Sequence, residues 1–129
     1  MKVVIIGGVA GGASAAARLR RLDESAEIVM LERTGYVSYA NCGLPYYVGG
    51  VIADRAELTL QTPERFRERF NIDVRVGSEV TAINREAKTV SVREAETGRI
   101  YEEPYDKLIL APGAASVVPA AVSLDSPRV

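Results

Sequence analysis

The stretch KVVIIGGVAGGASAAA, residues 2–17, decides the fold of this chain. Its first part, Lys2 to Ile6, is a short apolar and β-branched run, typical of a strand buried on both faces of a parallel sheet. The glycines that follow allow a sharp turn, and the small residues from Ala13 to Leu22 predict a helix that starts in that turn. The stretch therefore predicts a central strand, a glycine turn and a helix.

A turn of this kind favours an anion, because it directs backbone N–H groups and the positive end of the helix dipole at one point. A pyrophosphate suits that point. A dinucleotide also needs an acidic residue about twenty positions further on to bind a ribose hydroxyl. Glu32 supplies it, at the end of the strand predicted for Glu27 to Leu31. Together these features predict the beginning of a dinucleotide-binding βαβ unit.

The glycine pattern departs from G-x-G-x-x-G in one place. If Gly7 and Gly12 are its first and last glycines, the middle position is Val9. Gly8 and Gly11 can supply the missing backbone freedom, so we interpret the loop as a variant of the motif. The alternative is a turn that only packs a helix on a sheet, which the register of strand, turn, helix and acid disfavours.

The composition is that of one ordinary soluble domain. The chain has 129 residues, with 16 basic and 17 acidic side chains and a net charge of −1, so its charge favours neither nucleic acid nor a membrane surface. No apolar run approaches membrane-spanning length, and the chain opens directly into a strand without a signal pattern. We therefore expect a cytoplasmic protein.

The chain has one cysteine and no histidine. This excludes an internal disulfide framework and predicts no metal site, so any chemistry rests on Cys42 or on a cofactor. Ser38 or Asn41 could cap a short helix that begins near Cys42, and a helix start favours the reactive thiolate. The alternative is a small buried hydrophobe. The neighbouring Asn, Gly and Pro favour a reactive thiol that cycles through a mixed disulfide, persulfide or sulfenic acid, with a flavin as electron source.

Three polar residues, Ser14, Arg18 and Arg21, form one stripe on the predicted helix. They could grip a second phosphorylated ligand, but spacing alone favours a solvated face.

The rest of the chain adds one helix and several strands. Thr62 as N-cap and Pro63 predict a helix to about Phe70. Alternating segments at 73–76, 79–84, 89–95 and 99–105 predict a small antiparallel excursion. Lys107 to Leu110 returns as a buried strand, and the turn after it is expected to face the cofactor. Residues 1–113 would form the domain, and 114–129 a linker or cut end.

Four segments carry a family resemblance: VVIIGGVAGGASAAARLRRL, the strand end at Glu32-Arg33, the segment SYANCGLP around Cys42, and YDKLILAPGA. They resemble the pyridine nucleotide-disulfide oxidoreductases. Within that family the chain is similar to the coenzyme A-disulfide reductases, especially the rhodanese-fused branch associated with coenzyme A persulfide reduction. Relatives that reduce peroxide or oxygen have a histidine in the glycine loop where this chain has Ala10.

The resemblance implies an α/β, Rossmann-like FAD-binding domain with a parallel sheet and a small antiparallel excursion. The implied FAD contacts are Gly7, Gly8, Val9, Ala10, Gly11 and Gly12 at the pyrophosphate, Glu32 and Arg33 at the adenosine, Val80 near the adenine, Ala111, Pro112 and Gly113 along the cofactor, and Asn41 and Cys42 at the flavin. The implied coenzyme A contacts are Ser14, Arg18 and Arg21 at the nucleotide, which reverses the preference for a solvated face, and Ser38 and Asn41 near the thiol.

Members of this family are much longer and bind NAD(P)H in a further domain. We therefore expect an N-terminal fragment, inactive alone, of a homodimeric NAD(P)H:disulfide oxidoreductase that reduces coenzyme A disulfide, persulfide or polysulfide through Cys42. The alternatives are an NADH oxidase or peroxidase-type flavoprotein that uses a cysteine sulfenic acid, and a non-redox nucleotide-binding module with a structural cysteine.

Overall fold

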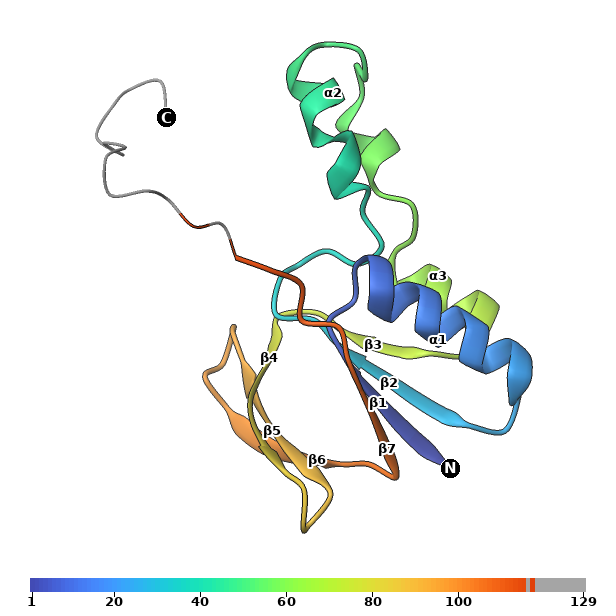
Figure 1. Cartoon of the computed structure of the whole chain (residues 1–129), viewed down its shortest axis with the longest axis vertical. Coiled ribbons are helices and arrows are strands. Elements are labelled where there is room, and N and C mark those ends of the chain that lie inside the picture. The colour runs from blue at the N-terminus through green and yellow to red at the C-terminus, as the bar shows by residue number, and fades with distance from the viewer. Residues whose placement is uncertain (116, 118–129) are drawn as a thin grey trace.

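The computed structural model describes residues 1–115 and residue 117. A four-stranded parallel sheet forms its centre, in the order β3-β2-β1-β7, and a separate three-stranded antiparallel sheet lies on one side of it (Figure 1). The parallel strands are β1 (Lys2–Ile6), β2 (Glu27–Leu31), β3 (Asp73–Arg75) and β7 (Lys107–Leu110). The predicted α/β class is confirmed, with β1 inside the sheet as expected.

Both faces of the parallel sheet are covered, which explains why the two inner strands, β1 and β2, are apolar after their first residue. Helices α1 (Ala10–Leu22) and α3 (Pro63–Phe70) lie on one face, and the antiparallel sheet lies on the other (Figure 1). Successive side chains of a strand point to opposite faces. Val3 and Ile5 of β1 therefore join the core under the helices, while Val4 joins the core between the sheets.

The antiparallel sheet consists of β4 (Ser78–Asn84), β5 (Thr89–Glu94) and β6 (Ile100–Pro104), in that order. This agrees with the predicted excursion except at its first segment. The segment predicted at 73–76 is β3, which pairs in parallel with β2 and belongs to the main sheet. The reason is burial: Ile72, just before β3, is fully buried in the core under the helices, and Val74 packs against that core.

Helix α3 begins as predicted. The side chain of Thr62 accepts a hydrogen bond from the N–H of Arg65 at 3.3 Å, and Pro63 occupies the first turn. Helix α1 begins at Ala10, three residues before the predicted start. Its first turn therefore contains Gly11 and Gly12, which the prediction had placed in the preceding turn.

The segment around Cys42 projects from the sheets beside the start of α1 (Figure 1). It contains a 3₁₀ turn (Asn41–Gly43), α2 (Leu44–Val48) and a second 3₁₀ turn (Arg55–Leu58). Neither Ser38 nor Asn41 caps this helical segment: Ala40 holds the N-cap position, and no side chain bonds there. The backbone of Ser38 is used differently, because its N–H donates to the carbonyl oxygen of Gly8 at 2.8 Å.

Most of the segment 114–129 lies outside the described residues. Its assignment as a linker or cut end therefore stays a prediction. Among the helices that the structure does describe, none is both long and apolar enough to cross a membrane.

Candidate functional site

The glycine turn is a point of very close backbone packing. Gly7 has a φ of +92°, and a Cβ atom added there would lie 2.0 Å from the carbonyl oxygen of Ala111. A Cβ atom added at Gly12 would lie 1.8 Å from the carbonyl oxygen of Gly7. Only glycine fits either position. The ends of β1 and β7 and the start of α1 therefore meet with bare backbone between them.

Gly7 supplies the positive φ of the turn. We had expected Gly8 and Gly11 to supply this backbone freedom. Neither Gly8 nor Gly11 has a positive φ. A side chain at Gly11 would meet only the Cβ atom of Ala111, at an ordinary 3.5 Å. The expectation that Gly8 and Gly11 compensate for Val9 through a positive φ is therefore wrong, although a Cβ atom at Gly8 would lie only 2.7 Å from Cγ1 of Val37, so close packing requires glycine there too.

Glu32 joins the glycine turn to the end of β2. Its Oε2 accepts the N–H of Gly8 at 2.8 Å, and its Oε1 accepts the N–H and the hydroxyl of Thr34 at 2.8 and 2.9 Å. The residue is only 6% exposed. An ionised carboxylate has about four acceptor positions, so these three bonds leave about one for a ligand. Glu32 therefore holds the turn in place and offers a ligand its remaining acceptor position.

A cavity of about 140 Å³ lies next to Glu32, between the ends of the parallel strands and the start of β4. It brings together five residues that sequence reasoning had assigned to a cofactor: Gly7, Glu32, Arg33, Val80 and Pro112. Sequence reasoning missed its other lining residues, Ile6, Leu31, Ser78 and Glu79. Ile6 and Leu31 are the last residues of their strands, and ligands bind beyond the carboxyl ends of parallel strands, so their position could have indicated a role in the site. No local signal places the start of β4 there.

Ala111 and Gly113 do not line this cavity, and neither do the glycines beyond Gly7. Ala111 instead touches the glycine turn, and its N–H donates to the carbonyl oxygen of Ile6 at 2.8 Å. Gly113 is exposed and has a φ of +72°. Some of the predicted cofactor residues thus line the cavity, and others form the close-packed glycine turn next to it.

Cys42 lies in the 3₁₀ turn Asn41–Gly43, and it is exposed. Its neighbour Asn41 is exposed too. The hydrogen bond from Ser38 to Gly8 ties the start of this segment to the glycine turn. The alternative of a small buried hydrophobe is therefore wrong, because the thiol is open to a ligand or reagent.

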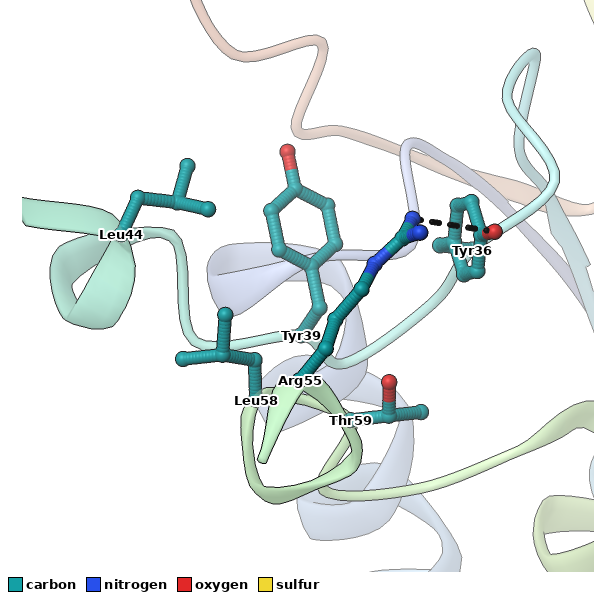
Figure 2. Close-up of a pocket in the computed structure, with 6 residues that line it drawn as sticks. All are labelled: Tyr36, Tyr39, Leu44, Arg55, Leu58 and Thr59. Carbon is teal, nitrogen blue, oxygen red and sulfur yellow. Dashed lines mark hydrogen bonds between the residues drawn. The ribbon is translucent and has the colours of Figure 1, made fainter. Parts of the chain in front are cut away.

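A second pocket, of about 130 Å³, lies between residues 36–44 and the 3₁₀ turn Arg55–Leu58 (Figure 2). The guanidinium of Arg55 donates to the hydroxyl of Tyr36 at 3.3 Å and lies 5.6 Å from the centre of its ring. The lining residues are Tyr36, Tyr39, Leu44, Arg55, Leu58 and Thr59. Sequence reasoning missed this pocket, because its two walls are separated in the chain by about ten residues or more.

The stripe of Ser14, Arg18 and Arg21 is exposed along α1, as the spacing predicts. Within the described residues neither arginine forms an ion pair, whereas the neighbouring Arg20 is buried. At about 1.5 Å per residue, Arg18 and Arg21 lie about 12 and 16 Å along the helix from Ala10. The same described part of the chain contains no cluster of three metal-ligating side chains.

A parallel sheet with a glycine turn between its central strand and the following helix defines a Rossmann-like dinucleotide-binding domain. Residues 1–126 match the model of the pyridine nucleotide-disulphide oxidoreductases, and the chain belongs to that family. The family uses FAD and NAD(P)H.

Within the family, the chain is similar to the following proteins. The coenzyme A disulfide reductase of Staphylococcus aureus is 48% identical over 115 residues, which are 89% of this chain and 26% of that protein. The reduced CoADR-RHD of Bacillus anthracis is 59% identical with a TM-score of 0.90, over 92% of this chain and 21% of that one. The NAD-dependent persulfide reductase of A. fulgidus is 40% identical with a TM-score of 0.89, over 93% of this chain and 23% of that one. The chain thus spans about a quarter of the length of these relatives.

Proposed function

We propose that this chain is the FAD-binding part of a flavin-dependent NAD(P)H:disulfide oxidoreductase that reduces coenzyme A disulfide, persulfide or polysulfide through Cys42. The observation that carries the proposal is the position of Cys42. It is the only cysteine, it is exposed, and its segment is bonded to the glycine turn through Ser38. The similarity to a coenzyme A disulfide reductase and to a persulfide reductase supports this choice of substrate.

The residues present fit FAD. The glycines at Gly7 and Gly12 let the end of β1 and the start of α1 pack closely, and the N–H groups and the dipole at that helix start favour an anion such as a pyrophosphate. The neighbouring cavity offers the adenosine an acceptor on Glu32 and the apolar side chain of Val80. In the whole enzyme FAD would supply the electron pair that comes from NAD(P)H.

Cys42 would carry out the thiol chemistry. Its thiolate sulfur attacks one sulfur of the substrate, the substrate's S–S bond breaks, and a mixed disulfide forms on Cys42 while the first thiol leaves and takes up a proton. Reduction of that mixed disulfide by two electrons and a proton releases the second thiol and restores Cys42. An exposed sulfur suits this role because a bulky disulfide must reach it.

The basic stripe on α1 would bind the nucleotide end of the substrate. Arg18 and Arg21 are exposed, and neither is engaged in an ion pair in residues 1–115. Guanidinium groups bind phosphates strongly, often through two hydrogen bonds at once. Ser14, one turn before Arg18, adds a hydroxyl to the same face, while Ser38 and Asn41 lie in the segment that carries the thiol.

The test is the Cys42→Ser variant of the full-length protein, because a serine hydroxyl does not ionise at ordinary pH. The variant is expected to purify with the same flavin content and to be reduced by NAD(P)H. Its turnover of coenzyme A disulfide and persulfide should fall by at least about a thousandfold. Ser91→Ala, in β5 and outside both cavities described above, is the control and should retain full turnover. Normal turnover in Cys42→Ser would overturn the proposal.

A further inference from the structure

A buried ion cluster joins the parallel sheet to the antiparallel sheet. Glu103 of β6 is 6% exposed, and its carboxylate is shared by two cations. One oxygen lies 2.6 Å from Nζ of Lys2 on β1, and the other lies 2.5 Å from Nη1 of Arg75 at the end of β3. Burial acts to raise the pKa of Glu103, but the bonds from Lys2 and Arg75 outweigh it and hold the pKa below its usual value.

The side chain of Arg75 is fixed by several partners at once. Besides Glu103 it contacts the carboxylate of Asp73 at 2.7 Å and the hydroxyl of Tyr101 at 3.1 Å. Its guanidinium also lies 5.9 Å from the centre of the Tyr101 ring. Two of these partners, Glu103 and Tyr101, belong to β6, so the position of Arg75 depends on where β6 lies.

The backbone of Arg75 continues this connection to the cofactor cavity. Its carbonyl oxygen accepts the N–H of Glu32 at 2.9 Å. Three residues later, the N–H of Ser78 donates to the carbonyl oxygen of Glu32, also at 2.9 Å. Glu32 and Ser78 both line the cavity. Arg75 therefore has its side chain bound to the antiparallel sheet and its main chain bound to the residue that faces the ligand.

Apolar contacts alone do not set this geometry. Val90 and Val92 of β5 pack against Val4, Val29 and Leu31 of the parallel sheet. Such packing draws the sheets together but is non-directional, so it specifies their relative position only loosely. The bonds of Glu103 have a defined length and direction. They therefore add a directional restraint between β6 and the parallel sheet to the main-chain bonds that connect Arg75 and Ser78 with Glu32.

We propose that Glu103 is a positioning residue for the adenosine side of the FAD site. It does not line the cavity. It acts through Arg75, which holds Glu32 and the first residues of β4 at the spacing that a bound adenosine requires. This inference rests on the proposed function, because it assumes that the cavity receives the adenosine of FAD.

The experiment measures ligand affinity in the flavin-free full-length protein by isothermal titration calorimetry with FAD and with ADP. The variant is Glu103→Gln, which keeps the size of the side chain but removes its charge. The matched control is Glu94→Gln: Glu94 of β5 also pairs with an arginine, Arg99, but its side chain is 26% exposed, and its bonds go to Arg99 and Thr97 and not to Lys2 or Arg75. Every titration is made at a temperature where the variant is fully folded.

We expect Glu103→Gln to raise the dissociation constants of FAD and ADP by the same factor, about tenfold, because the altered contacts are all on the adenosine side. Glu94→Gln should leave both constants unchanged. A Glu103→Gln variant that unfolds at lower temperature but binds both ligands normally would overturn the inference, since its role would then be structural only. If the unmodified protein binds neither ligand, the proposed function itself fails.

Tyr101→Phe provides a milder second variant if Glu103→Gln does not fold. It removes only the hydroxyl that Arg75 contacts and keeps the ring. We expect its affinity for FAD and ADP to fall by a smaller factor, about threefold. Unchanged affinity for both ligands in this variant would also contradict the inference.

Discussion

At the scale of single residues, the glycines of the turn differ sharply in what they tolerate. A Cβ atom at Gly12 would overlap the carbonyl oxygen of Gly7, which belongs to the backbone and cannot move aside without shifting the end of β1. Gly11 is its neighbour in the first turn of α1, yet a methyl group there meets only ordinary contacts. The two positions therefore form a matched pair for a stability experiment.

We predict that Gly12→Ala lowers the free energy of unfolding by about 3 kcal/mol or more, because the backbone must shift to relieve the overlap. Gly11→Ala should raise it by up to about 1 kcal/mol, since alanine loses less conformational entropy than glycine in a helix. Urea unfolding of both variants measures the difference. Equal stabilities of the two variants would contradict the packing described for the turn.

At the scale of elements, a single arginine joins the ends of two helices. Arg20 is buried in α1, and its guanidinium donates to the carbonyl oxygens of Phe70 and Asn71 at the end of α3, at 2.7 and 2.8 Å. It also donates to the carbonyl oxygens of Asp23 and Glu24 just after α1, at 3.2 and 2.5 Å. The last carbonyls of a helix have no partner within it, so Arg20 satisfies both helix ends together.

We predict that Arg20→Met lowers the free energy of unfolding by about 3 kcal/mol, because it leaves these carbonyl oxygens without their donor while keeping the apolar stem of the side chain. The neighbouring Arg21 is exposed, so Arg21→Met should change stability by less than about 0.5 kcal/mol. Thermal and urea unfolding of the pair test this. A similar decrease in the free energy of unfolding in both variants would show that stability depends on the positive charge and not on the hydrogen bonds of Arg20.

At the scale of the whole molecule, the ion cluster between the sheets predicts how stability depends on pH. The folded-state pKa of Glu103 lies below its ordinary value of 4.5. Its stabilising effect is therefore complete above pH 4.5 and is lost as the pH falls through the folded-state pKa. For Lys2 burial acts to lower the pKa, but the bonds to Glu103 and Glu27 outweigh it and raise the pKa above 10.5. Its effect is complete below pH 10.5 and is lost as the pH rises.

We predict that the free energy of unfolding of the unmodified protein decreases steeply from pH 5 to pH 3. In Glu103→Gln that decrease should be shallower, because one of the carboxylates responsible no longer titrates. Urea titrations at several pH values compare the two slopes, with Glu94→Gln as control. The pKa of Glu94 is lowered to about 2 by its bonds with Arg99 and Thr97, so its own effect is also lost from about pH 4.5 downwards, and Glu94→Gln compares a partly exposed ion pair with the buried one. Parallel curves for Glu103→Gln and the unmodified protein would contradict the assignment.

Local patterns were sufficient to predict the first βαβ unit. The apolar runs of β1 and β2, the glycines between them and Glu32 are close in sequence and carry the pattern of the motif themselves. The same holds for α3, whose start depends on Thr62 and Pro63, and for the hairpin strands, whose alternation and turn residues are local. These elements form with bounds within a few residues of those predicted.

Contacts between distant parts of the chain decided the rest. No local pattern indicates that residues 73–75 pair with β2, or that Ser78 and Glu79 lie beside Glu32. A long-range contact also involves Ser38, which we had expected to cap the helix near Cys42. Its N–H instead donates to Gly8, a residue thirty positions earlier. Sequence alone thus determined the strands, helices and candidate chemical groups. Only the tertiary structure determined which groups share a cavity, because long-range pairing depends on the packing of the whole core.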